Sequence, residues 1–222
     1  MTMRRGVVAV VAHGAVVVAL AVLCGPASAQ DAAASQPTPS PSPAHDHPIA
    51  DAATFLAGGV LALAAHEGGH LVFDGLFSAD PRVTHVQFGP FPFFAITHRA
   101  DLSPRREFTI SSAGFWVQEG TNEWLLTRRP GLRHEHAPLA KGAFAFNVLN
   151  SVGYAAVAFF RAGPSERDTR GMATIGVDER VIGAMVLAPA MLDAYRYFRP
   201  GSRWAAWTSR LVKAGSVLMV LK

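Results

Sequence analysis

Two histidines and a glutamate stand together in a stretch that is otherwise small or apolar. His66 and His70 are four residues apart, and Glu67 follows the first of them in the segment His-Glu-Gly-Gly-His. On a helix this spacing places both imidazoles on one face, where they can bind a single metal ion. A glutamate in this position takes a proton from a metal-activated water and passes it to the leaving amine of a peptide bond. The segment therefore predicts a metal site, with zinc as the ion and Glu67 as the catalytic base and acid.

The surroundings of this motif strengthen the prediction. The motif follows an apolar run from Phe55 to Ala65 and precedes Leu71, Val72 and Phe73. Ionisable side chains are costly inside an apolar helix unless they are paired or bind a metal. The plain alternative is a helix with two surface histidines. Gly68 and Gly69 each cost about 1 kcal/mol in a helix relative to alanine, which indicates that a backbone or a substrate approaches closely there.

The composition limits the class of protein. Half of the 222 residues are hydrophobic and only 16% are charged, a balance that favours a membrane-resident or deeply buried helical protein. This length fits one domain and a leader. The arginines are scattered among acidic residues and form no basic stripe, so no nucleic-acid partner is expected.

The N-terminal residues are typical of an export signal. Residues 1–29 contain Arg4 and Arg5, an apolar run and an Ala-Ser-Ala cleavage signal that ends at Ala29. An uncleaved signal anchor is the alternative. Residues 30–48, rich in Pro, Ser and Ala, predict a disordered linker, and residues 49–222 form the predicted helical membrane domain. The expected location is the cell envelope, in the inner membrane, with the periplasm as the alternative.

Five apolar stretches follow the linker, at residues 52–73, 108–126, 143–160, 181–198 and 204–221. Each has about the length of a membrane span, yet each carries polar residues that lipid would not tolerate, so the helices should pack with their polar faces inward. A β-branched and aromatic segment at residues 83–98 predicts a β-hairpin. The expected fold is mainly α, a multi-helix membrane bundle of about four to five apolar helices after the leader, with a short hairpin between the first two. His85 and His98 on the hairpin could line a substrate path, although exposed strand histidines are commoner.

These features together resemble the site-2 protease family, intramembrane zinc metalloproteases whose HExxH motif lies in a membrane helix. Three features follow one another as in the family, namely the motif, the Gly-rich hairpin near Phe88 to Phe91, and Arg106 to Gly114, which is similar to a family helix with an Ala-Gly-Pro signature. The likeness covers about residues 52–150. It implies a zinc cofactor, a membrane location and a peptide or membrane-protein substrate.

The chain departs from the family at the third zinc ligand. Phe146 to Asn150 is similar to the family's Asn-x-x-Pro segment, but Asn150 replaces the proline, and no Leu-Asp-Gly follows to supply the ligand aspartate. The resemblance implies that Asn147 and Asn150 bind the substrate backbone; hydrogen bonding between helices is the alternative.

Three acidic residues could replace the missing ligand. Asp168 follows the Asn147 helix in the family order and is the first choice. Asp193 copies the Pro-x-x-Leu-Asp part of the family segment, although Arg196 offers it an ion pair. Glu119 would fit the other large HExxH class, in which a glutamate on a later helix completes the site.

The leading hypothesis is a membrane zinc metallopeptidase that cuts a peptide bond in or near the bilayer. A non-catalytic envelope scaffold or binding protein that keeps the fold is the second hypothesis, because Leu-Asp-Gly is missing. A soluble periplasmic metallopeptidase is the third.

Trp204 and Trp207, with Arg203 and Arg210 nearby, are typical of a helix anchored at a membrane boundary, and core packing of the tryptophans is the alternative.

Overall fold

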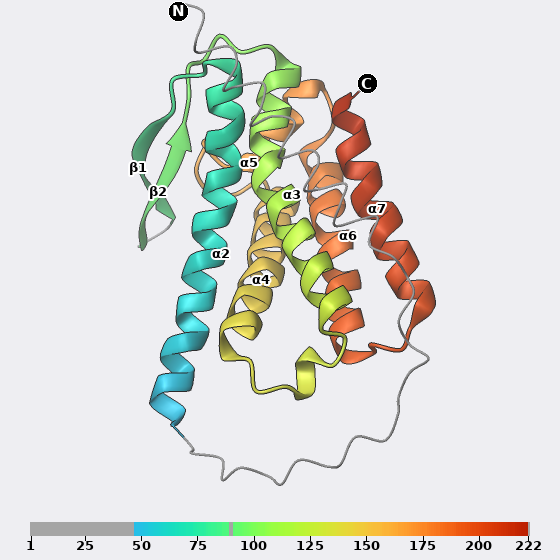
Figure 1. The fold of residues 1–222 in the computed structure, drawn as a ribbon. Coiled ribbons are helices and arrows are strands. Elements are labelled where there is room, and N and C mark those ends of the chain that lie inside the picture. Colours follow the sequence, from blue (N-terminus) through green and yellow to red (C-terminus); the bar gives the residue numbers. More distant parts are fainter. Residues whose placement is uncertain (1–46, 89–90, 222) are drawn as a thin grey trace, which may run out of the picture.

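The computed structural model describes residues 47–88 and 91–221, which form a helical bundle with one β-hairpin (Figure 1). The predicted leader and nearly all of the predicted linker lie outside the described residues. The elements, with the labels of Figure 1, are α2 (Pro48–Phe77), β1 (Arg82–Phe88), β2 (Phe91–Thr97), α3 (Pro104–Arg128), α4 (Pro138–Phe160), α5 (Asp168–Met172), α6 (Glu179–Phe198) and α7 (Arg203–Leu221). Short 3-10 turns occur at Leu132–His134 and Ala173–Ile175. The predicted mainly helical fold, with a hairpin between the first two helices, is confirmed.

Three of the long helices begin at a proline. Pro48, Pro104 and Pro138 open α2, α3 and α4, where the missing N–H would have had no partner and the fixed φ suits a helix. The apolar pattern placed the start of α3 near Phe108. The helix begins four residues earlier because its first turn is polar and adds no apolar signal.

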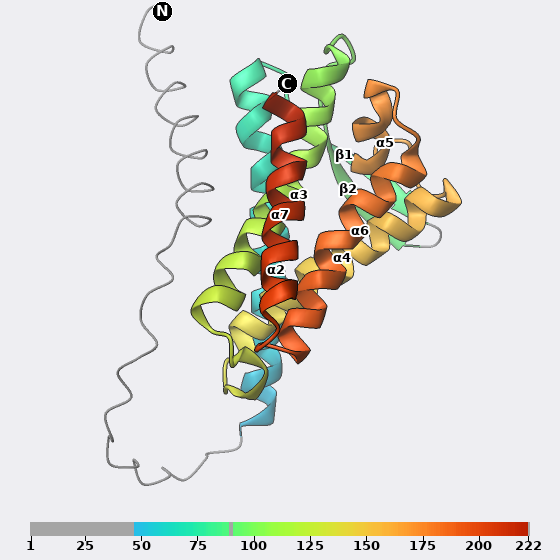
Figure 2. The same ribbon diagram turned by 90° about the vertical axis from the view of Figure 1, so that its right-hand side faces the viewer.

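The helices pack closely along most of their length. α2 lies against α3 and α4, α4 lies against α6, and α7 packs on α6 and α3. Figure 2 shows α7 on the outside of the bundle. A Cβ at Gly58 would collide with the Leu139 carbonyl, and one at Gly142 would collide with the Phe55 carbonyl. These glycines therefore let the backbones of α2 and α4 approach one another, as small residues do between membrane helices.

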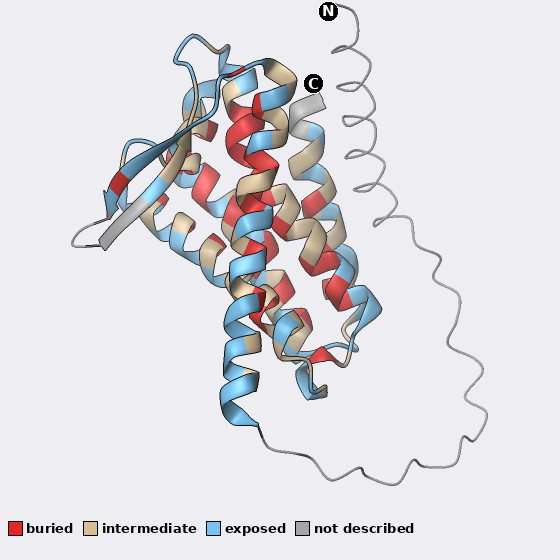
Figure 3. Ribbon diagram, turned by 60° about the vertical axis from the view of Figure 1, so that its left-hand side comes forward, coloured by how far each residue is buried: buried red, intermediate tan, exposed pale blue. Residues whose placement is uncertain are grey.

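The bundle buries polar side chains beside its apolar core and exposes large apolar side chains on its outside. Polar side chains lie inside, including those of Gln118, Asn122, Glu123 and Asn147, all at most 3% exposed. α2, α4 and α6 are long and apolar enough to cross a membrane, and only 11% of the most apolar window of α2 is buried. Figure 3 shows this largely exposed N-terminal half of α2. The predicted inward orientation of the polar faces is confirmed.

A buried charge cluster joins α3, α6 and α7. Glu123 accepts hydrogen bonds from Arg196, from Arg210 Nε at 2.9 Å and from Lys213 Nζ at 3.1 Å. Lys213 also donates to Asp193 at 2.7 Å. Because each buried charge has an opposite charge beside it, the cluster holds α7 on the bundle without an unpaired ion.

The hairpin lies beside the C-terminal half of α2. Its strands pair antiparallel, with Arg82 opposite Thr97 at the base. The backbone N–H of Arg99 donates to the Ala79 carbonyl at 3.0 Å, which ties the chain after β2 to the chain after α2. The base of the hairpin therefore meets the end of α2 that follows the histidine motif.

Candidate metal centre

Two helices bring three potential metal ligands to one point. His66 and His70 lie on one face of α2, and Asp168 opens α5. His66 Nε2 and His70 Nε2 are 3.2 Å apart, and Asp168 Oδ2 lies 3.3 Å from the first and 3.5 Å from the second. Among the residues that the structure describes, this is the one group of three His, Cys, Asp or Glu side chains that could hold a metal ion.

The three separations fit a tetrahedral ion. Zinc binds histidine nitrogen and carboxylate oxygen at about 2.0–2.2 Å, and tetrahedral angles then separate neighbouring ligand atoms by roughly 3.3 Å. The observed 3.2, 3.3 and 3.5 Å match this separation. Three protein ligands leave a fourth position for water or substrate, as catalytic zinc sites do.

The surroundings of His70 and Asp168 prepare both side chains to bind a cation. His70 Nδ1 donates to the Ile110 carbonyl at 2.7 Å. With a metal bound, this hydrogen bond would leave the Nε2 lone pair facing the ion, which is the usual outer-shell arrangement of metal-binding histidines. Burial by itself would raise the pKa of Asp168, but His70 and His66 outweigh it and hold the pKa below its ordinary value. This lowered pKa favours the carboxylate form, which is the form that binds a cation.

Small and aromatic residues fix the ring of His66. A Cβ at Gly114 would lie 2.5–2.6 Å from three atoms of this ring, so the ring occupies the space that a side chain would need. Phe115 meets the ring edge-on at 5.4 Å between centroids, and the Tyr154 ring lies at 6.1 Å. Tyr154 also interacts with the Asp168 carboxylate. The position of His66 is therefore set by packing on α3 and α4.

Contacts on both sides hold Asp168 in place. Gly171, one turn later on α5, lies so close to Ser111 of α3 that a Cβ would collide with its hydroxyl. Arg167, the residue before, forms two hydrogen bonds with Glu179 at 2.6 and 2.7 Å, and Thr169 donates to the same carboxylate at 2.9 Å. The short helix is thereby fixed against α3 and the start of α6.

The predicted catalytic glutamate lies beside the three ligands. Glu67 is half-buried and interacts electrostatically with His66, His70 and Asp168. Within the described residues its carboxylate accepts no hydrogen bond, so its oxygens remain available to a water. The two glycines that follow differ from one another. A Cβ at Gly69 would lie 2.8 Å from the Ala113 carbonyl, whereas nothing lies within 4 Å of one at Gly68, so the expected close approach occurs at Gly69.

A comparison of the chain with protein-family models, with curated proteins and with solved structures finds no match. The resemblance to site-2 proteases therefore stays a prediction, and function can be inferred here from the geometry of the site.

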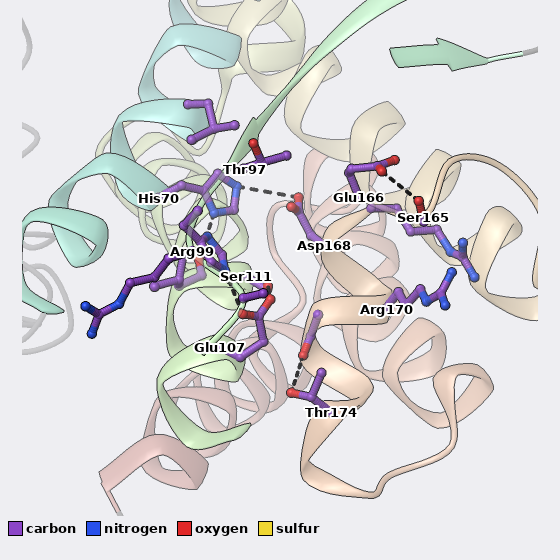
Figure 4. A pocket seen from close by; sticks show the side chains of 16 residues that line it. His70, Thr97, Arg99, Glu107, Ser111, Ser165, Glu166, Asp168, Arg170 and Thr174 are labelled. Atoms are coloured by element: carbon purple, nitrogen blue, oxygen red, sulfur yellow. Dashed lines mark hydrogen bonds and ion pairs between the residues drawn. The ribbon is translucent and has the colours of Figure 1, made fainter. Parts of the chain in front are cut away.

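A cavity of about 290 Å³ opens beside the triad. Figure 4 shows His70 and Asp168 on its wall, joined by a dashed line, with Glu107 and Ser111 of α3 nearby. Ile96 and Thr97 of β2 also line it. Its volume is near the lower end of the range for small-ligand pockets.

The other predicted ligands lie elsewhere. Asp193 belongs to the charge cluster, where it binds Lys213 and Ser209. Glu119 accepts a hydrogen bond from Ser216 of α7 at 3.2 Å. Neither residue belongs to the group that could hold a metal.

The two asparagines of α4 lie between helices. Asn147 donates to Asn122 of α3 at 2.9 Å, while the amide nitrogen of Asn150 is buried without a hydrogen-bond partner among the described residues. Asn147 thus makes the helix-to-helix contact that was the alternative to substrate binding.

Several residues around the site were not predicted from the sequence to belong to it. Tyr154 gave no signal because its relation to Asp168 depends on how α4 and α5 pack. His85 is exposed, as a strand histidine usually is, but the side chain of His98 is only 12% exposed and lies between Asp74 and Glu107. The spacing of His66, His70 and Asp74, four residues each, could have placed Asp74 on the same face of α2.

Proposed function

We propose that the protein is a membrane-bound zinc metallopeptidase that hydrolyses a peptide bond in or near the bilayer. The observation that carries the proposal is the convergence of His66 Nε2, His70 Nε2 and Asp168 Oδ2 at separations that fit one tetrahedral ion. The missing Leu-Asp-Gly segment was the reason for the scaffold hypothesis. That reason weakens because Asp168 offers a carboxylate where a third ligand is needed.

The chemistry assigned to each group follows from its place. His66, His70 and Asp168 would hold the ion, which when bound lowers the pKa of a water to near 7 and polarises a carbonyl group. Glu67 takes a proton from the attacking water and delivers it to the leaving nitrogen. Phe115 and Tyr154 keep bulk water away from the buried side of His66.

A membrane location is supported by the outer surface of the bundle. Large apolar side chains are exposed on α2, α4, α6 and α7, among them Leu56, Leu149, Met191 and Leu211, and contiguous apolar surface of this kind marks contact with lipid or with a partner. Trp204 and Trp207 are each 60% exposed, and Arg210 lies over the Trp207 ring at 5.7 Å. This arrangement favours the membrane-boundary anchor over core packing of the tryptophans.

The hairpin supplies a way to bind an extended peptide. The described sheet has two strands, so one edge of β2 carries no strand partner, and Ile96 and Thr97 of β2 line the cavity. A substrate segment added along this edge would reach the metal position as a strand.

Metal content tests the proposal directly. The full chain, purified in detergent, should contain about one zinc ion, and His66→Ala or Asp168→Asn should lose it. Glu166→Gln is the matched control, since Glu166 lies two residues from Asp168 and accepts a hydrogen bond from the Ser165 hydroxyl at 2.6 Å; this variant should keep the ion. Wild-type protein without any divalent metal, after purification without chelators, would overturn the proposal.

Membrane extraction separates the leading hypothesis from a soluble periplasmic enzyme. Alkaline carbonate should leave the protein in the membrane pellet, because the apolar faces of α2, α4 and α6 hold it there. Release into the supernatant would favour the soluble alternative.

A further inference from the structure

A second group of ionisable side chains lies at the cavity, apart from the metal triad. His98, which follows β2, donates from Nε2 to Glu107 Oε2 of α3 at 2.6 Å. Its Nδ1 lies 3.4 Å from Oδ1 of Asp74, one turn beyond His70 on α2. Glu107 also accepts a hydrogen bond from Ser111 at 3.3 Å. One imidazole thus connects the base of the hairpin to α2, which carries the two histidines of the metal site, and to α3.

The charge state of His98 follows from the groups that face it. Asp74 is fully buried, and neither of its oxygens accepts a hydrogen bond from the described residues. A carboxylate in such a place requires a counter-charge. The hydrogen bond to Glu107 raises the pKa of His98, and the negative charge of Asp74 raises it further. Burial and the nearby His70 lower this pKa, but the net shift is upward. An imidazolium would place one positive charge between the Glu107 carboxylate, to which Nε2 donates, and the Asp74 carboxylate, which lies 3.4 Å from Nδ1.

The connections within the hairpin do not fix it to the helices. The hydroxyls of Thr84 and Thr97 bond to one another at 2.8 Å, and Thr97 also donates to the Arg82 carbonyl. The Arg99 backbone bond to Ala79 holds the two chain segments at the base, and β2 also lies against α2. The side chain of His98 adds two further attachment points, on α2 and on α3.

We propose that His98 is a positioning residue, which clamps the base of the hairpin to α2 and α3 so that Ile96 and Thr97 form a fixed wall of the cavity for a bound peptide. The peptide part of this inference rests on the proposed peptidase function, whereas the clamp itself does not. His98 does not contact the metal triad and takes no part in bond cleavage. Its effect is to keep the edge of β2 at a constant position relative to His70.

Hydrogen exchange on the full chain in detergent tests the clamp. The variant is His98→Ala combined with Asp74→Asn, because the second change removes the carboxylate that would otherwise be buried without a counter-charge. Exchange of the amides in Arg82–Phe88 and Phe91–Thr97 should accelerate by about tenfold or more, as for a segment that opens locally, while α2 and α3 exchange as in wild type. His85→Ala, an exposed histidine on the same hairpin, is the matched control and should change nothing.

Two further measurements distinguish a positioning role of His98 from a loss of the metal site. Zinc content should stay at the wild-type level in the double variant, and the KM for a peptide should rise while kcat changes little. Unchanged exchange in the hairpin would overturn the clamp, as would an equal acceleration throughout the chain. If the wild-type protein holds no metal and cleaves no peptide, the proposed function fails, and the exchange result still decides the clamp.

Discussion

Replacing Gly114 by alanine should disrupt the metal site although it changes none of the three predicted ligands. The new Cβ would lie 2.5 Å from Cε1 and 2.6 Å from Nδ1 and Nε2 of His66, whereas carbon atoms in contact need about 3.5–4.0 Å. The ring must therefore move by about 1 Å. It is 1% exposed and enclosed by Phe115, Tyr154 and His70, so it cannot move without leaving the ligand position.

The expected loss of zinc affinity follows from how precisely metal ligands must be placed. Ligand distances must hold within about 0.2 Å, and disturbing only the outer shell already costs 10- to 100-fold in affinity. A shift of about 1 Å in His66 should therefore weaken zinc binding by at least about 100-fold, or roughly 2.7 kcal/mol. Overpacking should also cost the fold about 1–3 kcal/mol, less up to about 1 kcal/mol gained from replacing a helical glycine.

Competition with a chromogenic chelator measures the zinc affinity, and circular dichroism checks that the helices remain. Gly120→Ala is the matched control, since Gly120 lies on the same helix and nothing lies within 4 Å of a Cβ there; it should bind zinc as wild type does. A Gly114→Ala protein that is folded and keeps wild-type affinity would show that His66 is not a ligand.

Three further predictions address catalysis, stability and pH. Glu67→Gln should keep its zinc and lose about 10²- to 10⁴-fold in peptide hydrolysis, because the amide cannot take the proton; a fluorogenic peptide assay measures this, and equal rates would remove Glu67 from the mechanism. Glu123→Ala should lower the free energy of unfolding by about 3–5 kcal/mol, since it leaves Asp193 as the one carboxylate beside the two buried cations Arg196 and Lys213 in the described cluster. Glu135→Ala, which removes a partly exposed pair with Arg129, should cost at most about 1 kcal/mol; denaturation in detergent compares the two variants. The pKa of His98 is raised, so its contribution to the clamp should be complete below about pH 6.5 and be lost as the pH rises through the raised pKa. Hairpin exchange, corrected for its intrinsic pH dependence, should show this loss in wild type and not in the His98→Ala, Asp74→Asn variant.

The sequence predicted the main elements because their signals are local. The apolar runs, the opening prolines and the broken β-branched segment at residues 83–98 each depend on neighbours within one element. The preference for Asp168 over Asp193 and Glu119 came from the family order of segments, and the structure places Asp168 with the histidines. A local signal also disfavoured Asp193 as a ligand, since Arg196 three residues later indicated an ion pair.

Contacts between distant segments could not be predicted in the same way. The charge cluster depends on Lys213 reaching Asp193 and Glu123, which lie 20 and 90 residues earlier. His98 was expected at the surface because nothing in its own segment indicates Asp74 or Glu107. Such pairs become visible only when the packing of the helices is known.

The ligands of the metal site are separated by 102 residues between His66 and Asp168, and this separation bears on how the chain matures. A nascent chain that ends before α5 already contains both histidines and Glu67 but lacks the carboxylate that completes the site. Even a longer chain needs Ser111 and Glu179 in place before α5 can hold Asp168 against α3. For the proposed peptidase, this order means that hydrolytic competence would be acquired late in biosynthesis, after α5 has docked, so that an incomplete translation product would lack a complete site.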